Sequence, residues 1–119
     1  MTWTVEDHLA DKSATIRTLY EAFEELISGC GPSQRSVTKT AIVFKGQVRG
    51  FAGVTPRMHT LAGFLDLMEP VSEPPFTRAS AYTKRLWVNR FVIRETAELD
   101  GRFAARVAAA WAVGNGAHR

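Results

Sequence analysis

The spacing of the hydrophobic residues changes twice along this chain, and that change restricts the folds that it can adopt. Early in the chain the apolar side chains recur every three or four positions, as one face of an α-helix requires: Ile16, Leu19, Tyr20, Phe23, Leu26, Ile27 and Cys30. Ser13 can cap the start of this helix, and Gly31-Pro32 can end it. Helical spacing returns near the end of the chain, where Thr96 can cap a helix over residues 97–113.

Between these helices the spacing of the apolar residues changes to two, which is the period of a β-strand. We expect strands over three ranges: 36–44, 47–54 (joined by a turn at Lys45-Gly46) and 84–94. Residues 57–67 fit a strand better than a short helix, whereas the proline-rich residues 69–80 should form a loop. The sequence therefore predicts an α+β fold, an antiparallel sheet of about four strands with an N-terminal and a C-terminal helix packed on one face. We see no internal repeat and treat residues 1–119 as a single domain.

The composition is typical of a folded, soluble domain. Hydrophobic residues make up 45% and charged residues 23% of the 119 positions, and no apolar run approaches the length of a membrane span. The N-terminal segment lacks the basic start and apolar centre of a signal peptide, and the single cysteine, Cys30, cannot form an internal disulfide. We therefore expect a cytoplasmic protein without a membrane partner.

The charges are unevenly distributed along the chain. The net charge of +3 and the pI of about 9.4 permit an anionic partner without requiring one. From Lys39 to Arg94, lysine and arginine clearly outnumber aspartate and glutamate, whereas acidic residues concentrate near the N-terminus. The predicted strands are therefore basic, and the first long helix is acidic.

The sequence carries no motif of a common catalytic or metal-binding class. It has no phosphate-binding P-loop, no nucleophile-elbow serine motif and no zinc-binding pair of cysteines or histidines. His8, His59 and His118 are far apart and follow no ligand spacing. We therefore expect no metal site and no cofactor.

Lys39 has an unusual position in the predicted hairpin. A two-residue turn pairs Phe44 with Gln47, which places Lys39 in a row of small side chains that a helix should cover. The rest of this row is Val37, Ala41, Val43, Val48, Gly50, Ala52 and Val54. In one interpretation the ammonium group of Lys39 extends to the wet edge of the sheet. In the other it faces a cleft, partly desolvated, and binds a carboxylate or phosphate.

A second candidate region is the segment YTKRLWVNR, residues 82–90. It contributes a phenol, three cations, an amide and an indole: Tyr82, Lys84, Arg85, Arg90, Asn89 and Trp87. Together with Arg49, Phe44 and Phe51 they could form a basic, aromatic sheet surface of the kind that binds single-stranded nucleic acid, which Arg57 and His59 could extend. In the alternative interpretation Trp87 packs in the core with Phe91, and the cations surround it.

Five stretches distributed over nearly the whole chain carry a resemblance to a known family: TVEDHLADK, SVTKTAIVFKG, RGFAG, AYTKRLWVNRF and AVGNGAH. They resemble a bacterial family of small domains of unknown function, number 5655 in the domain-of-unknown-function series. The resemblance implies a compact α+β domain that occurs alone or joined to other modules, some of them nuclease-like. It also implies that many members carry histidine where this chain has Asn89. The recurring family features would fall on Lys39, Phe44, Tyr82, Lys84, Arg85 and Trp87.

Our leading interpretation is a non-enzymatic binding domain for an anionic partner, either nucleic acid or a small molecule with a phosphate or carboxylate group. Its ligand-binding residues would be Lys39, Arg49, Tyr82, Lys84, Arg85 and Trp87. The alternative is a small enzyme in which Lys39, with Tyr82 and His59, performs acid–base or imine chemistry on a carbonyl compound. A third interpretation is a protein-interaction module or homodimer, with the aromatic surface as the interface.

Overall fold

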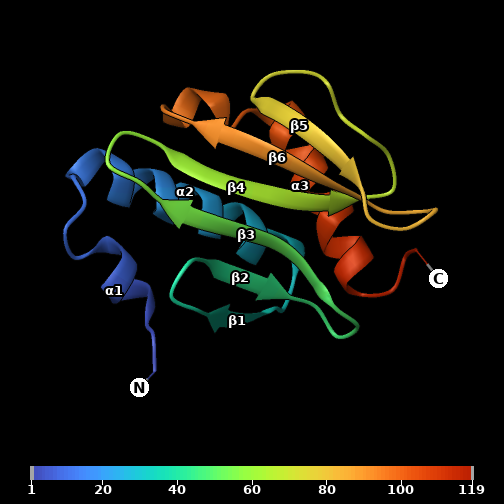
Figure 1. The fold of residues 1–119 in the computed structure, drawn as a ribbon, viewed down its shortest axis with the longest axis horizontal. Helices are drawn as coiled ribbons and strands as arrows, with labels where there is room; N and C mark the ends of the chain where they lie inside the picture. The colour runs from blue at the N-terminus through green and yellow to red at the C-terminus, as the bar shows by residue number, and fades with distance from the viewer. Residues whose placement is uncertain (1, 119) are drawn as a thin grey trace.

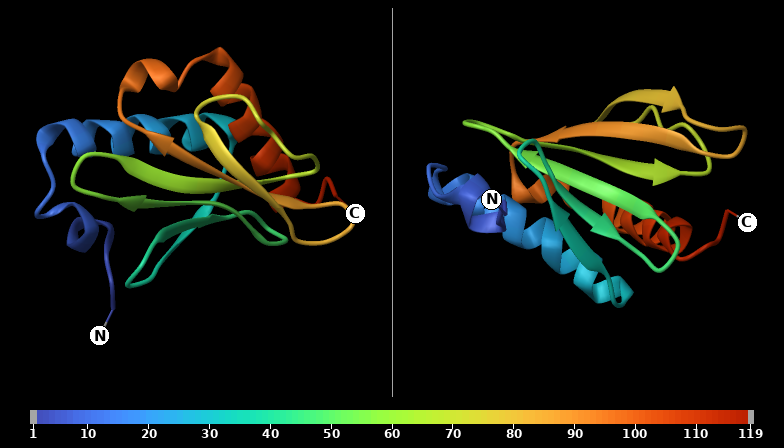
Figure 2. Two further views of the ribbon diagram at one scale, coloured as in Figure 1. Left: turned by 45° about the horizontal axis from the view of Figure 1, so that its top comes forward. Right: turned by 60° about the horizontal axis from the view of Figure 1, so that its bottom comes forward.

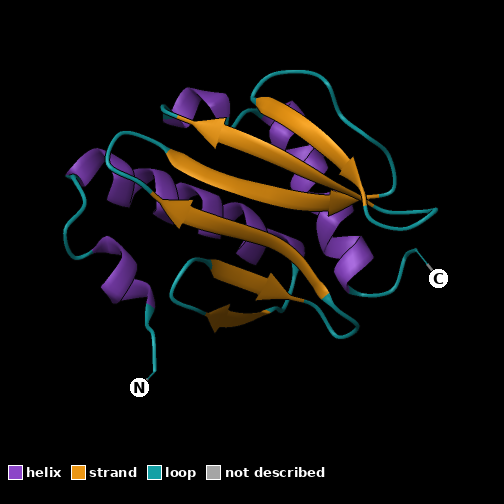
Figure 3. Cartoon of the chain, viewed as in Figure 1, coloured by secondary structure: helices purple, strands orange, loops and turns teal. Residues whose placement is uncertain are grey.

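The computed structural model describes residues 2–118 (Figure 1). Its helices are α1 (Val5–Leu9), α2 (Ala14–Cys30) and α3 (Gly101–Gly114), and a 3₁₀ turn, η1 (Thr96–Glu98), precedes α3. Its strands are β1 (Gln34–Val37), β2 (Ile42–Lys45), β3 (Gly50–Pro56), β4 (Leu61–Leu67), β5 (Phe76–Ala81) and β6 (Trp87–Ile93). Figure 3 shows these helices and strands coloured by type. None of the described helices is long and apolar enough to cross a membrane.

All the strands belong to one antiparallel sheet, in the order β1-β2-β3-β4-β6-β5. Helices α2 and α3 pack on one side of this sheet, as the views in Figures 1 and 2 agree. The predicted α+β class, with an antiparallel sheet between N-terminal and C-terminal helices, is confirmed. No helix of residues 2–118 covers the other side of the sheet, which we call the open face.

The sheet has six strands, so the prediction of about four was wrong. One additional strand comes from the division of a predicted strand, and the other lies in a predicted loop. The predicted strand 36–44 is interrupted because the Thr38 hydroxyl accepts the backbone N–H groups of Thr40 and Ala41, which stabilises a turn. Strand β5 lies in the predicted loop. Phe76 is its one buried residue, so the segment lacks the apolar alternation that indicates a strand.

The connection between β2 and β3 also differs from the predicted two-residue turn. It spans residues 46–49, and Phe44 pairs with Ala52 instead of Gln47. Two backbone N–H groups of this loop donate to the carbonyl oxygen of Gly114, at 2.9 and 3.2 Å. The loop therefore supplies hydrogen-bond donors to a backbone carbonyl group at the C-terminal end of α3. This contact between distant parts of the chain sets the register of the hairpin.

This register reverses the two faces of β2 relative to the prediction. Ile42 and Phe44 are buried beneath the helices, whereas Val43 lies on the open face. Phe44, which the family resemblance singles out, packs edge-on against Phe23 with the ring centroids 5.9 Å apart. Lys39 is not part of the covered row, because it lies in the exposed turn between β1 and β2.

The core fills the space between the sheet and the helices α2 and α3. At its centre is a cluster of aromatic rings whose centroids are 5.2 to 6.3 Å apart: Phe23, Phe44, Phe76, Phe91 and Phe103. Gly63 on β4 makes room for this cluster, since a Cβ atom there would lie 2.6 Å from Phe91 Cζ. The helix-covered face therefore carries the core, and the open face remains uncovered by any described helix.

Each long helix begins at a polar cap. Helix α2 follows Ser13, whose hydroxyl accepts the N–H of Ile16 at 3.3 Å, as the sequence predicted. Helix α3 begins later than predicted, because Asp100 caps it by accepting the N–H of Phe103 at 3.0 Å. The predicted cap, Thr96, instead starts the 3₁₀ turn.

Candidate functional site

The strands contain more basic than acidic residues. Among the described strands Asp66 is the sole acidic residue, and the basic residues are Arg35, Lys45, Arg78 and Arg90. Arg35 points to the helices and pairs with Glu24 of α2. The other three strand cations form no ion pair within residues 2–118. An unpaired excess of cations favours an anionic partner.

Phe64 supplies an aromatic surface in the middle of the open face. Its half-buried side chain lies on β4, with Gly53 of β3 and Arg90 of β6 as register partners. A Cβ atom at Gly53 would lie 2.5 Å from Phe64 Cε1, so the missing side chain lets the ring approach the β3 backbone closely. A ring fixed in this way offers a π-face to a planar ligand.

A shallow hollow of 240 Å³ borders this ring. Arg57, from the turn between β3 and β4, and Arg90 line the hollow together with Thr55 and Thr77. Both guanidinium groups belong to exposed residues, and neither forms an ion pair within the described chain. Arginine binds phosphate and carboxylate groups with two parallel hydrogen bonds. The hollow can therefore hold an anionic group beside an aromatic ring.

Arg49, Asp66 and Tyr82 form a second cluster at one end of the open face. Arg49 Nη2 donates to Asp66 Oδ2 at 2.7 Å, and Arg49 Nε donates to the carbonyl oxygen of Gly50 at 3.0 Å. The guanidinium carbon lies 5.3 Å from the ring centroid of Tyr82, within the range of a cation–π contact. The sequence predicted both Arg49 and Tyr82 as ligand-binding residues, and the structure brings them into contact.

Asp66 has the most unusual environment of the described acidic residues. It is 5% exposed, and its Oδ1 atom has no hydrogen-bond partner within residues 2–118. Burial raises the pKa of this carboxyl group, and the Arg49 guanidinium partly opposes that effect. A buried carboxylate with an unsatisfied oxygen is costly, and such groups are frequent at functional sites.

The other candidates from the segment 82–90 lie beside this cluster but face in different directions. Lys84 and Arg85 are exposed in the turn between β5 and β6, and Arg85 Nη1 donates to the carbonyl oxygen of His118 at 3.4 Å. Trp87 pairs with the buried Leu67, so it belongs to the helix-covered side and is half-buried there. Trp87 therefore does not share the open face with Tyr82.

Lys39 and His59 lie at the opposite end of the sheet from Tyr82. Lys39 is exposed in the turn between β1 and β2, and His59 is exposed in the turn between β3 and β4. Figure 1 shows these turns at the other end from the β5–β6 turn. Since a seven-residue strand such as β4 is about 20 Å long and several strands also lie between the two turns, Lys39 and Tyr82 are separated by more than about 20 Å. The structure thus does not assemble Lys39, Tyr82 and His59 into one site.

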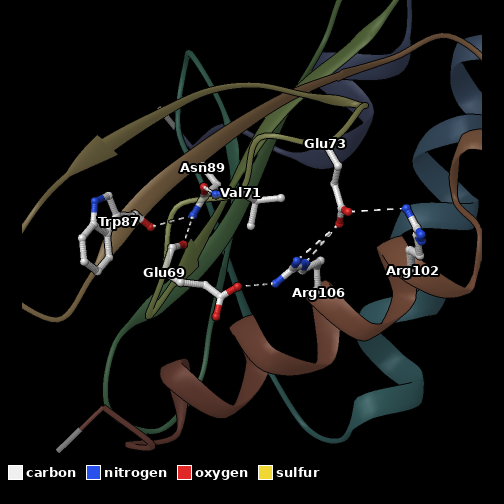
Figure 4. Close-up of polar contacts among 7 residues, drawn as sticks. All are labelled: Glu69, Val71, Glu73, Trp87, Asn89, Arg102 and Arg106. Carbon is white, nitrogen blue, oxygen red and sulfur yellow. Dashed lines mark hydrogen bonds and ion pairs between the residues drawn. The ribbon is translucent and has the colours of Figure 1, made fainter.

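A network of polar contacts holds the β4–β5 loop on the helix side, away from the open face (Figure 4). The buried Asn89 side chain accepts the N–H of Val71 at 2.7 Å and donates to the carbonyl oxygen of Glu69 at 3.1 Å. Arg106 of α3 reaches the carboxylates of Glu69 and Glu73, at 3.0 and 3.4 Å. Position 89 is where the family resemblance implies histidine. In this chain the Asn89 side chain binds backbone groups of the β4–β5 loop at that position.

Phe64 and Asp66 are candidate residues that the sequence analysis missed, whereas Arg90 belongs to the segment 82–90 that it singled out. Phe64 and Arg90 are separated by an entire loop and strand in the sequence, and the β4–β6 register brings them together. Asp66 could have been noticed in the sequence, because an acidic residue within an otherwise apolar strand, GFLDL, is unusual. The placement of these residues on the open face follows from the register between the strands, which the sequence alone does not give.

Comparisons with known proteins give a family but no activity. A family model described as Domain of unknown function (DUF5655) matches residues 5–114 of the chain. The match covers all the described strands and all of α3, so it includes both clusters on the open face. No curated protein and no solved structure shows a significant match.

Proposed function

The chain belongs to the DUF5655 family, and from its geometry we propose that it binds single-stranded nucleic acid on the open face of its sheet. The observation that carries this proposal is the position of Phe64. Its half-buried ring lies on an uncovered sheet face beside Arg90, in a hollow that Arg57 also lines, and neither arginine forms an ion pair within residues 2–118. An aromatic ring that stacks a base, next to cations that pair with phosphates, is the usual arrangement for binding single-stranded nucleic acid.

The second cluster extends this surface along the sheet. Tyr82 and Arg49 offer another ring and another cation, and Asp66 holds Arg49 in place. Phe64 and Asp66 are two residues apart on one strand, so their Cα atoms are separated by about 7 Å. Unstacked bases of one strand could therefore contact Phe64 and Tyr82, while Arg90 and Arg49 pair with phosphates near those bases.

A small-molecule site is a poorer explanation for the same residues. Pockets for small ligands usually enclose about 300–1,000 Å³ and bury most of the ligand surface. The hollow beside Phe64 holds 240 Å³ and lies on an uncovered sheet face. A chain-like ligand gains contacts along the whole face, whereas a small ligand would remain largely in water.

The direct test is a fluorescence-anisotropy titration with labelled single-stranded DNA, single-stranded RNA and a duplex, at about 50 mM and about 200 mM salt. We expect salt-dependent binding of a single strand in preference to the duplex. Phe64→Leu, which keeps an apolar side chain but removes the π-face, should weaken binding roughly 5- to 150-fold, because one stacked base contributes about 1–3 kcal/mol.

Arg90→Ala and Arg102→Ala form a charge-matched pair for the same experiment. Arg90 lies on the open face, whereas Arg102 is exposed on α3, on the helix side. Arg90→Ala should reduce the slope of log affinity against log salt by about 0.7, the value for one phosphate contact in a single strand. Arg102→Ala should leave the slope unchanged. Absence of binding at low salt, or equal effects of the two variants, would reject the proposal.

A further inference from the structure

The turn that carries Lys39 is fixed from two sides. His8 Nε2 donates to the carbonyl oxygen of Thr38 at 2.7 Å, which ties the turn to α1. The hydroxyl group of Thr55 donates to the carbonyl oxygen of Thr40, also at 2.7 Å, which ties the turn to β3. Lys39 lies between these two anchored residues and is itself exposed. The fold therefore presents this lysine from a fixed backbone, which reduces the entropy lost when it binds an anion.

Lys39 borders a groove of 660 Å³ between its own turn, α1 and the end of β3. Arg57 enters the same groove from the β3–β4 turn. Trp3 and His8 also line the groove, with their ring centroids 6.0 Å apart, and Trp3 remains 37% exposed. The groove thus combines two cations with an accessible indole ring.

The acidic residues of the groove are already occupied by neighbouring groups. The Asp7 carboxylate accepts the backbone N–H of Thr4 at 2.8 Å and so completes the cap of α1. Asp11 pairs with Lys12 at 2.6 Å. Neither carboxylate pairs with Lys39 or Arg57, and these two cations form no other ion pair within residues 2–118. The groove therefore keeps a positive charge that an anion can neutralise.

The groove is continuous with the hollow on the open face. Thr55 and Arg57 line both of them, so a ligand that passes Phe64 and Arg90 can continue into the groove. Helix α1 forms the far wall of the groove. A nucleic-acid strand that follows the open face in this direction therefore meets a wall beyond Lys39, and its end would lie in the groove.

We propose that this groove binds the terminal phosphate of the strand, with Lys39 and Arg57 on the phosphate and Trp3 beside the last base. This inference rests on the proposed function. A terminal phosphate monoester carries a charge of about −1.5 to −2 at neutral pH, whereas a phosphodiester inside the strand carries a single negative charge. Two unpaired cations, in a groove whose basic residues outnumber its acidic ones, therefore favour the end of a phosphorylated strand over its interior.

The test compares three unlabelled oligonucleotides of one sequence, about six nucleotides long, in competition against a labelled strand. One has a 5′-phosphate, one a 3′-phosphate and one hydroxyl groups at both ends. We expect one phosphorylated strand to bind about tenfold more tightly than the hydroxyl-ended strand, because of the additional charge beside two cations. Inorganic phosphate should compete weakly, since it lacks the rest of the strand.

Lys39→Ala and Lys84→Ala are matched variants, because each removes an exposed lysine from a turn between strands, at opposite ends of the sheet. Lys39→Ala should abolish the preference for the phosphorylated end and leave binding of the hydroxyl-ended strand unchanged. Lys84→Ala should keep the preference. Equal binding of the three strands, or a preference that survives Lys39→Ala, overturns the inference while leaving the proposed function intact. Failure of every strand to bind at low salt overturns both.

Discussion

The Asp66→Asn substitution should raise the affinity for single-stranded nucleic acid and also stabilise the folded protein at neutral pH. Asparagine has nearly the shape of aspartate, and its amide oxygen can still accept the hydrogen bond from Arg49, which is 2.7 Å long in the structure. The substitution therefore removes a negative charge while keeping the contact that orients the guanidinium group. A simple count of ion pairs predicts the opposite change in stability.

The effect on stability follows from the direction of the pKa shift. Burial raises the pKa of Asp66 above 3.8 in the folded state even though Arg49 is adjacent, so the folded state disfavours the ionised form. The contribution of this group to stability is fully present below pH 3.8 and is lost as the pH rises through the raised pKa. Over that interval the wild-type protein should lose stability relative to Asp66→Asn, which resembles the neutral form.

The effect on binding follows from the position of the charge. A phosphate on the far side of the Arg49 guanidinium would lie about 7 Å from the Asp66 carboxylate. At that distance the repulsion is about 0.6 kcal/mol at the dielectric constant of water and about 2.4 kcal/mol at an effective value of 20. Removing it should tighten binding roughly 3- to 50-fold.

Two measurements check this prediction: anisotropy titrations at low salt, and urea unfolding between about pH 4 and pH 7. Glu25→Gln is the matched control, because it removes an exposed negative charge from α2 on the helix side and changes the net charge equally. If Asp66→Asn binds no better than Glu25→Gln, Arg49 does not contact the ligand. Lower stability of Asp66→Asn at neutral pH would show that the Arg49 pair outweighs the cost of burial.

Three further changes test other parts of the structure. The double variant Lys84→Ala/Arg85→Ala should lower affinity and reduce the salt slope by about 1.4, two phosphate contacts, in anisotropy titrations; an unchanged slope would exclude the turn from the site. Asn89→Ala should destabilise the fold by about 2–4 kcal/mol in urea unfolding, because it leaves buried loop groups unpaired; unchanged stability would contradict the role of the loop contacts. Gly53→Ala should displace the Phe64 ring, destabilise the fold by about 1–3 kcal/mol and weaken binding; unchanged stability and affinity would show that the ring position does not matter.

The elements that the sequence predicted well are those whose signal is local. Helix α2 carries a continuous apolar stripe and a polar cap, and both determine its bounds within one segment. Strand β6 has strong alternation and was predicted within a few residues. The family resemblance is confirmed by the family model, which matches residues 5–114. The resemblance could be recognised because it depends on stretches spread along the chain.

The predictions that failed depended on contacts between distant segments. The β2–β3 loop has four residues because it binds the end of α3 at Gly114, and nothing within the hairpin itself indicates that contact. The resulting register moved Val43 to the open face and removed Lys39 from the covered row. Strand β5 was missed because a strand at the edge of a sheet can form with a single buried side chain, Phe76.

The Arg49–Asp66 pair is hard to explain by stability alone. A buried ion pair often adds less stability than apolar side chains of similar size, and here one carboxylate oxygen lacks a partner within the described chain. The pair does, however, fix a guanidinium group at one place on a face that carries Phe64 and Tyr82. A fixed cation loses less entropy on binding than a free surface arginine. The cost of burying Asp66 is therefore best understood as the cost of presenting Arg49 to a ligand, and that interpretation predicts tighter binding when the charge of Asp66 is removed.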